Sequence, residues 1–207
     1  MKYVLYIIVA FIFSSARADQ AVDFFRAVSV DDAGTVKVLL ARGFDANATD
    51  AKGQTGLHLA LRDDSPKVVA TLLAHAQTRI DATNASDETP VMMAALRGQI
   101  EWTQKLLDRG AALNRPGWTP LHYAATGPES KLVALLLKRG ALLEALSPNR
   151  TTPLMMAARY GPEEAVDLLL ARGASLKARN DAGLGAADFA KLGGRESLAT
   201  RLAAAGR

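Results

Sequence analysis

The hexapeptide Thr119-Pro120-Leu121-His122-Tyr123-Ala124 decides the fold, because similar strings recur along the chain. The other copies are Thr55-Gly56-Leu57-His58-Leu59-Ala60, Thr89-Pro90-Val91-Met92-Met93-Ala94, Thr152-Pro153-Leu154-Met155-Met156-Ala157 and a divergent Gly185-Ala186-Ala187-Asp188-Phe189-Ala190. The five copies begin at residues 55, 89, 119, 152 and 185, so they lie 34, 30, 33 and 33 residues apart. A regular period of this length is typical of proteins built from stacked, similar units.

Each copy predicts the start of a helix, because threonine caps a helix N-terminus and proline fits its first turn. Four leucine-rich segments lie between the copies of the string or just before the first of them, and each ends in glycine. Each segment therefore predicts a second helix that ends in a left-handed C-cap. They are Leu39–Gly43, Leu106–Gly110, Leu136–Gly140 and Leu169–Gly173. The polar stretch after the first of them, residues 46–53, predicts a turn-rich finger loop. One such unit cannot bury its own apolar face, so stability must come from stacking on neighbours.

The period and the Thr-Pro-Leu-His-x-Ala string resemble the ankyrin repeat family, and the resemblance covers nearly all of residues 21–207. It implies an all-α solenoid of helix-turn-helix units joined by β-hairpin-like finger loops. Two departures stand out. The segment between Gly110 and Thr119 is three residues shorter than the one between Gly43 and Thr55, so one finger should be clipped. Residues 183–207 lack the threonine and proline, which predicts a C-terminal cap with Arg195 and Arg201 on its outer face.

The first eighteen residues predict a secretory signal peptide, residues 1–18. Lys2 is followed by an apolar run from Tyr3 to Phe13 and by the small residues Ala16 and Ala18. The run is too short for a membrane helix, which needs about 20 residues. An uncleaved anchor is the alternative, since one lysine is a thin positive flank.

The remaining residues, 19–207, form one predicted ankyrin-repeat domain. Its expected parts are an N-terminal cap over 21–50, repeats over 51–83, 84–114, 115–147 and 148–180, and a C-terminal cap over 181–207.

Composition excludes several function classes. The chain has 207 residues and no cysteine, which excludes disulfides, thiolate zinc sites and cysteine nucleophiles. The net charge of +4 falls to +2 if Lys2 and Arg17 leave with the signal peptide, so it gives no support to nucleic-acid binding. We expect a monomer with a protein partner, without nucleic acid, cofactor or metal, and with no membrane span after cleavage.

Histidines and glycines give no catalytic pattern. His58 and His122 share one position in two repeats, where Met92 and Met155 stand in the others, so we interpret these imidazoles as binding loop backbone. Residues 183–188 begin like a dinucleotide-binding motif but have no strand before them. No phosphate-loop, zinc-protease or serine-hydrolase string occurs. The prediction is a non-enzymatic protein.

The two tryptophans differ. Trp102 aligns with Leu132 and Ala165 on the second helices and is predicted to lie in the core. Trp118 stands beside the clipped finger, and the polar character of its counterparts, Gln54, Glu88 and Thr151, predicts that this position is exposed. Trp118 is then either an interface anchor or packing across the short loop.

The resemblance implies that finger tips and the inner faces of first helices bind partners. The candidate partner-binding residues in this register are Lys52, Gln54, Arg62, Glu88, Arg97, Trp118, Asn149, Arg159 and Tyr160. Their mixture of arginine, aromatic and acidic types suits a protein interface. The three arginines form a basic ridge or, alternatively, a set of solvated charges.

We therefore expect a protein–protein interaction scaffold or accessory factor in the bacterial periplasm, binding a partner such as a periplasmic enzyme. The alternatives are a secreted effector or immunity-type protein acting on a host or rival, and an enzyme with an unrecognised site.

Overall fold

The computed structural model describes residues 19–206, so the predicted signal peptide lies outside the described residues. The described residues divide into two compact units, an N-terminal unit that ends at Ser86 and a C-terminal unit that begins at Asp87. Along the described residues, no helix combines the length and the apolar character that crossing a bilayer requires.

In the N-terminal unit, residues 19–29 are helical and are followed by α2 (Ala33–Ala41), α3 (Gly56–Arg62) and α4 (Pro66–Ala74). Helix α4 packs against both α2 and α3. The ring of Phe24 is fully buried and leaves no room for a side chain at Gly56, where a Cβ atom would lie 2.6 Å from the ring. The N-terminal cap therefore packs directly on the start of α3.

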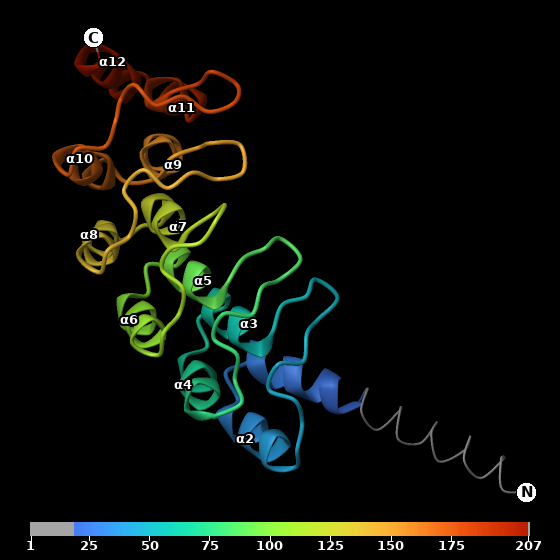
Figure 1. Cartoon of the computed structure of the whole chain (residues 1–207). Helices are drawn as coiled ribbons and strands as arrows, with labels where there is room; N and C mark the ends of the chain where they lie inside the picture. The colour runs from blue at the N-terminus through green and yellow to red at the C-terminus, as the bar shows by residue number, and fades with distance from the viewer. Residues whose placement is uncertain (1–18, 207) are drawn as a thin grey trace, which may run out of the picture. The chain divides into compact units, whose positions relative to one another are not determined.

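The C-terminal unit contains four helix pairs: α5 (Pro90–Leu96) with α6 (Ile100–Asp108), α7 (Pro120–Thr126) with α8 (Ser130–Lys138), α9 (Pro153–Tyr160) with α10 (Glu163–Ala171), and α11 (Ala186–Leu192) with α12 (Glu196–Ala205). The first helices form one row in which α7 contacts α5 and α9, and α9 contacts α11 (Figure 1). The second helices lie on one side of this row, and the loops before α7, α9 and α11 extend on the other (Figure 1). This is the all-α repeat architecture expected.

The predicted threonine cap forms at Thr55 and Thr152, whereas Thr89 and Thr119 make no side-chain cap hydrogen bond. Thr152 Oγ1 accepts the Met155 N–H at the start of α9, with Pro153 in the first turn. The glycines that follow the second helices have left-handed φ values of 86° to 92°: Gly43, Gly110, Gly140 and Gly173. The sequence therefore located both ends of the helix pairs correctly.

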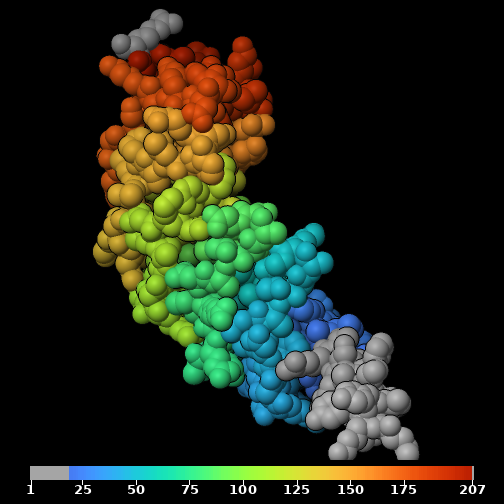
Figure 2. Space-filling model, turned by 45° about the vertical axis from the view of Figure 1, so that its right-hand side comes forward, coloured from blue at the N-terminus to red at the C-terminus, as the bar shows by residue number. Residues whose placement is uncertain are grey.

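Small residues set the spacing of the first helices in the C-terminal unit. Ala124, Ala125, Ala157 and Ala158 are fully buried between α5, α7, α9 and α11. At Gly161 the approach is closer still, because a Cβ atom there would lie 2.0 Å from the carbonyl oxygen of Ala125. The segments of this unit, coloured from green to red, follow one another as adjacent bands (Figure 2). The core is therefore shared between neighbouring repeats.

The finger loops are held by side chains together with backbone hydrogen bonds across the turn. In the described part of the chain, bridge pairing in the fingers is limited to the isolated pair Thr49 and Thr55. The Asp50 carboxylate accepts the backbone N–H groups of Lys52 and Gln54, both at 2.8 Å. Asn180 does the same for two N–H groups in the last finger. Asx turns of this kind mimic a backbone turn. Backbone hydrogen bonds from the Asp50 N–H to Gln54 and from the Asn180 N–H to Leu184 close the same fingers, which are therefore short hairpins.

Two predictions of side-chain burial are wrong, one for a residue expected on the surface and one for a residue expected in the core. Arg195 does not face outward: its Nη1 atom donates to the carbonyl oxygens of Ala157, Ala158 and Gly161 at the end of α9. Trp102 is half-buried instead of buried, and the Lys105 ammonium lies 4.5 Å from its ring centroid. The indole is too large for the space that Leu132 and Ala165 occupy in the other repeats, and it covers the surface under a lysine instead.

Candidate functional site

The open side of the first helices in the C-terminal unit carries the seventh residue of each helix and, in α7 and α9, also the fourth, whereas Met93 and Phe189 at the fourth position of α5 and α11 are buried. Residues three apart lie on the same helix face, and in α7 these are Tyr123 and Thr126. The seventh residue is Leu96 in α5 and Arg159 in α9. Because threonine is smaller than either of these, the surface over α7 is hollowed.

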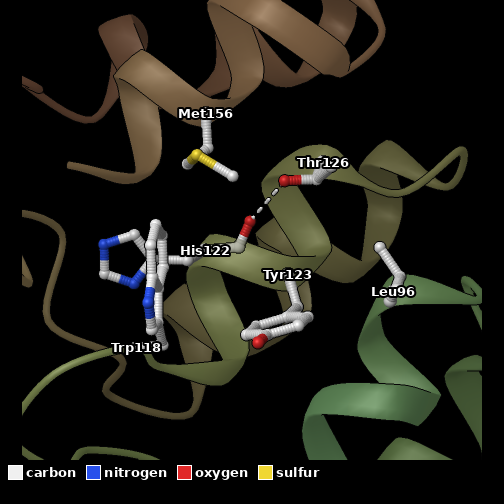
Figure 3. Close-up of a pocket in the computed structure, with 6 residues that line it drawn as sticks. All are labelled: Leu96, Trp118, His122, Tyr123, Thr126 and Met156. Carbon is white, nitrogen blue, oxygen red and sulfur yellow. Dashed lines mark hydrogen bonds between the residues drawn. The ribbon is translucent and has the colours of Figure 1, made fainter. Parts of the chain in front are cut away.

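This hollow is a pocket of about 140 Å³, which we call the Trp118 pocket. Its lining residues come from α5, α7, α9 and the clipped finger (Figure 3), and they are Leu96, Trp118, His122, Tyr123, Thr126 and Met156. The indole of Trp118 meets the His122 ring edge-on, with centroids 5.2 Å apart and planes at 79°. Trp118 is partly exposed. It therefore packs across the short finger and also presents a wall to solvent, which combines the two predicted roles.

The polar atoms of the pocket are engaged within the protein. The Tyr123 hydroxyl donates to Glu88 Oε1 at 2.9 Å. Thr126 Oγ1 donates to the His122 carbonyl oxygen at 2.9 Å (Figure 3). Burial, followed by the contact with Glu88, raises the pKa of Tyr123 well above its usual value, so the phenol stays protonated. These contacts leave a pocket surface that is almost wholly apolar.

The histidines have the structural role predicted for them. His122 Nδ1 accepts the Thr119 N–H at 3.2 Å, which places the ring proton on Nε2, and Nε2 donates to the Thr151 carbonyl oxygen at 3.0 Å. Burial lowers the pKa of His122 to about 4, so the ring is neutral at neutral pH. His58 repeats the first contact, accepting the Thr55 N–H at 3.2 Å. Among residues 19–206, no three histidine, aspartate or glutamate side chains gather in a metal-binding group.

Several predicted residues surround the Trp118 pocket. Glu88 is partly buried and holds Tyr123. Arg97 is exposed and directly follows Leu96, and Arg159 lies one helical turn beyond Met156.

Two further predicted residues stand apart from the lining. Tyr160 is 54% exposed, and the Arg159 guanidinium lies 4.9 Å from its ring centroid. Asn149 is exposed in the finger before α9, where its Oδ1 accepts from Ser147 and Thr151.

The predicted residues of the N-terminal unit form a separate cluster. Arg62 donates to Gln54 Oε1 at 2.9 Å and makes a two-point ion pair with Asp63 at 2.7 and 2.8 Å. Gln54 is only 7% exposed, so the expectation that this position is exposed is wrong, and the same holds for Thr151 at 1%. Lys52 is exposed on its finger. Because Arg62 is paired with Asp63, its charge is partly neutralised, which argues against a basic ridge that includes Arg62.

An alignment of the repeats at equivalent helix positions contains the information that predicts the pocket. Leu96 and Thr126 stand at variable positions that the repeat register marks as binding candidates, whereas Tyr123 and Met156 were not predicted. The signal was the small threonine at a helix position where both neighbouring repeats carry a longer side chain.

Comparison with known proteins identifies the repeats. A family model described as ankyrin repeats (3 copies) matches residues 24–116 and 104–180. The chain belongs to the ankyrin repeat family. Human Neurogenic locus notch homolog protein 2 is 35% identical over 112 residues, which is 53% of this chain and 4% of that protein. Ankyrin repeat protein nuc-2 of Neurospora crassa is 31% identical over 109 residues, which is 51% of this chain and 10% of that protein. The chain therefore spans only a small part of the length of these relatives.

A solved structure matches along most of both chains. It is described as Bd0816 Predatory Endopeptidase from Bdellovibrio bacteriovorus in complex with immunity protein Bd3460. The match has a TM-score of 0.73 at 26% identity, and it covers 88% of this chain and 97% of the other. Ankyrin repeats are protein-interaction modules, and the geometry of this chain fits that role.

Proposed function

We propose that this ankyrin-repeat protein is a non-enzymatic binding protein of the bacterial periplasm, where it acts as a scaffold or accessory factor for a periplasmic enzyme. The observation that carries the proposal is the Trp118 pocket, an open apolar surface beside Arg97 and Arg159, with the exposed Tyr160 against the Arg159 guanidinium. Partly exposed aromatic and arginine side chains around a pocket are typical of interface anchors. The signal-peptide pattern of residues 1–18 supports the periplasmic location.

Capture of a partner from periplasmic extract tests this proposal. The tagged mature protein is compared with the triple variant Arg97→Ala, Trp118→Ala, Tyr160→Ala. We expect the variant to lose the partner that the unchanged protein retains. The matched control carries Lys138→Ala and Arg172→Ala, which remove two exposed charges at the ends of α8 and α10. Equal capture by the triple variant excludes this face, and recovery of the protein only from the culture medium excludes the periplasmic role.

A second candidate is an immunity-type protein that binds an endopeptidase. It is favoured by the solved structure, whose description names an endopeptidase in complex with an immunity protein. The alignment with this protein covers almost all of the matched chain. This role predicts that the purified protein inhibits an endopeptidase encoded beside it, in a one-to-one complex. Full peptidase activity in the presence of excess protein would exclude it.

A further inference from the structure

We infer that the Trp118 pocket receives one apolar side chain from an extended segment of the partner, and that this segment carries a carboxylate on each side of the apolar residue. The inference rests on the proposed binding function and names what this face recognises.

The size of the pocket fits one side chain. An apolar cavity of about 150 Å³ accommodates benzene, and the Trp118 pocket has about 140 Å³. This space suits leucine, methionine or phenylalanine. The pocket opens on the exposed side of the row of first helices, where a polypeptide could reach it.

The chemistry of the walls selects an apolar occupant. The Tyr123 hydroxyl already donates a hydrogen bond to Glu88, and the Thr126 hydroxyl already donates one to the His122 carbonyl oxygen. Both ring nitrogens of His122 are also engaged, with Thr119 and Thr151. A polar side chain placed here would lose its hydrogen bonds to water without replacing them.

One polar atom remains for the backbone of the partner. Within residues 19–206, the indole N–H of Trp118 has no hydrogen-bond acceptor. Trp118 is partly exposed at the edge of the pocket, and a carbonyl oxygen of a bound segment would satisfy its N–H. This donor favours a polypeptide over a simple hydrocarbon ligand.

The charges beside the pocket favour carboxylates. Neither Arg97 nor Arg159 forms an ion pair with any residue of the described range 19–206. Two carboxylates near Tyr123 are already engaged, since Asp87 pairs with Arg115 at 2.7 Å and Glu88 accepts from Tyr123. Arg159 lies against the Tyr160 ring, and its charge and that of Arg97 are left for carboxylates of the partner.

The helix spacing sets the length of the motif. Packed helices lie about 8–10 Å apart, so Arg97 after α5 and Arg159 in α9 are separated by two such steps, roughly 16–20 Å. An extended chain covers about 3.3 Å per residue. Each carboxylate should therefore stand about two or three residues from the apolar residue.

Peptide selection tests this directly. Random phage-displayed peptides of about 12 residues, which reach roughly 40 Å when extended, are selected on the full mature protein. We expect enriched sequences to share a leucine, methionine or phenylalanine with an aspartate or glutamate on each side. The best sequence is then titrated as a synthetic peptide, with the Trp102→Phe background leaving Trp118 as the single tryptophan reporter.

The key variant is Thr126→Leu, which fills the hollow with the residue that α5 carries at the equivalent position, Leu96. This variant should raise the Kd of the peptide by at least about tenfold, which corresponds to about 1.4 kcal/mol of binding free energy. Thr200→Leu is the matched control, because Thr200 makes the same bond to the carbonyl oxygen four residues earlier, in α12. The double variant Arg97→Ala, Arg159→Ala should weaken binding about three- to tenfold and reduce its dependence on salt.

Three results would overturn the inference: no enriched sequence, enriched sequences without the apolar and acidic pattern, or unchanged affinity in Thr126→Leu. Failure of the proposed function is distinguishable from these results, because the triple variant would then capture as much partner as the unchanged protein. If the periplasmic partner is lost from the triple variant but retained by Thr126→Leu, the binding face stands and the pocket assignment falls.

Discussion

His122 Nε2 lies 3.0 Å from the carbonyl oxygen of Thr151, a residue 29 positions later in the chain. This hydrogen bond joins α7 to the finger of the next repeat and holds the ring that forms the base of the Trp118 pocket. Nε2 can donate in either protonation state, but Nδ1 accepts the Thr119 N–H, and it can do so only in the neutral imidazole. The position of the pocket is therefore linked to the protonation state of one buried histidine.

We predict that acid destabilises the protein through His122. Its pKa is about 4 in the folded protein, below the ordinary value of 6.5 expected in the unfolded chain. Between these values the unfolded state binds more protons, so the free energy of unfolding falls as pH falls from 6.5 towards 4. The loss attributable to this residue is about 3 kcal/mol. Urea unfolding followed by circular dichroism across this range measures it.

His122→Met separates this effect from the titration of carboxylates. Methionine occupies the equivalent third helix position in α5 and α9, where Met92 and Met155 accept the threonine N–H through sulfur. The variant should be about 1 kcal/mol less stable at neutral pH because the bond to Thr151 is lost. Its stability should then fall less with acid than that of the unchanged protein. Equal slopes would show that His122 does not titrate as described.

Arg195→Ala should destabilise the C-terminal unit by about 2–3 kcal/mol, since it removes charged hydrogen bonds from three backbone carbonyls at the end of α9. The measurement is chemical unfolding at neutral pH. Arg201→Ala is the control, because Arg201 is exposed and pairs only with the surface carboxylates Asp167 and Glu163. That change should cost less than about 1 kcal/mol. Similar losses in the two variants would refute the capping role of Arg195.

Local capping chemistry made the helices predictable, and contacts between repeats account for most of what the sequence missed. Thr152 and Pro153 mark the start of α9 because their effect is confined to one turn. Arg195 reaches Ala157, 38 residues away, so its inward orientation depends on the stacking of helices. The burial of Gln54 depends on its contact with Arg62 eight residues later.

The Trp118 pocket shows the same limit at the candidate site. Trp118 was selected because it stands beside a shortened finger, which is visible in the sequence. The pocket itself arises from three side chains on different helices, Leu96, Thr126 and Met156, and from the space that the smallest of them leaves. A difference between repeats at one register position therefore carried information that composition and motif strings did not.

Asn114 should act as a clamp between two fingers. Its Nδ2 donates to the Gly140 carbonyl oxygen and its Oδ1 accepts the Leu142 N–H, both at 2.9 Å. Asn114→Ala should cost about 1–2 kcal/mol of stability and speed hydrogen exchange at the Leu142 amide. Asn114→Asp keeps the acceptor and loses the donor, so the Leu142 amide should stay protected. Unchanged exchange in the alanine variant would exclude the clamp.

Gly161 is required by the close approach of α7 and α9 and not by its backbone angles. Its φ of −84° is open to any residue, yet a Cβ atom would lie 2.0 Å from the Ala125 carbonyl oxygen. Because backbone cannot yield as a flexible side chain does, Gly161→Ala should cost at least about 2 kcal/mol. Gly173→Ala provides the contrast: Gly173 has a left-handed φ of 89° and open space around it. Strain alone should then cost about 1–2 kcal/mol. If Gly161→Ala unfolds at the same urea concentration as the unchanged protein, the two helices do not meet as closely as described.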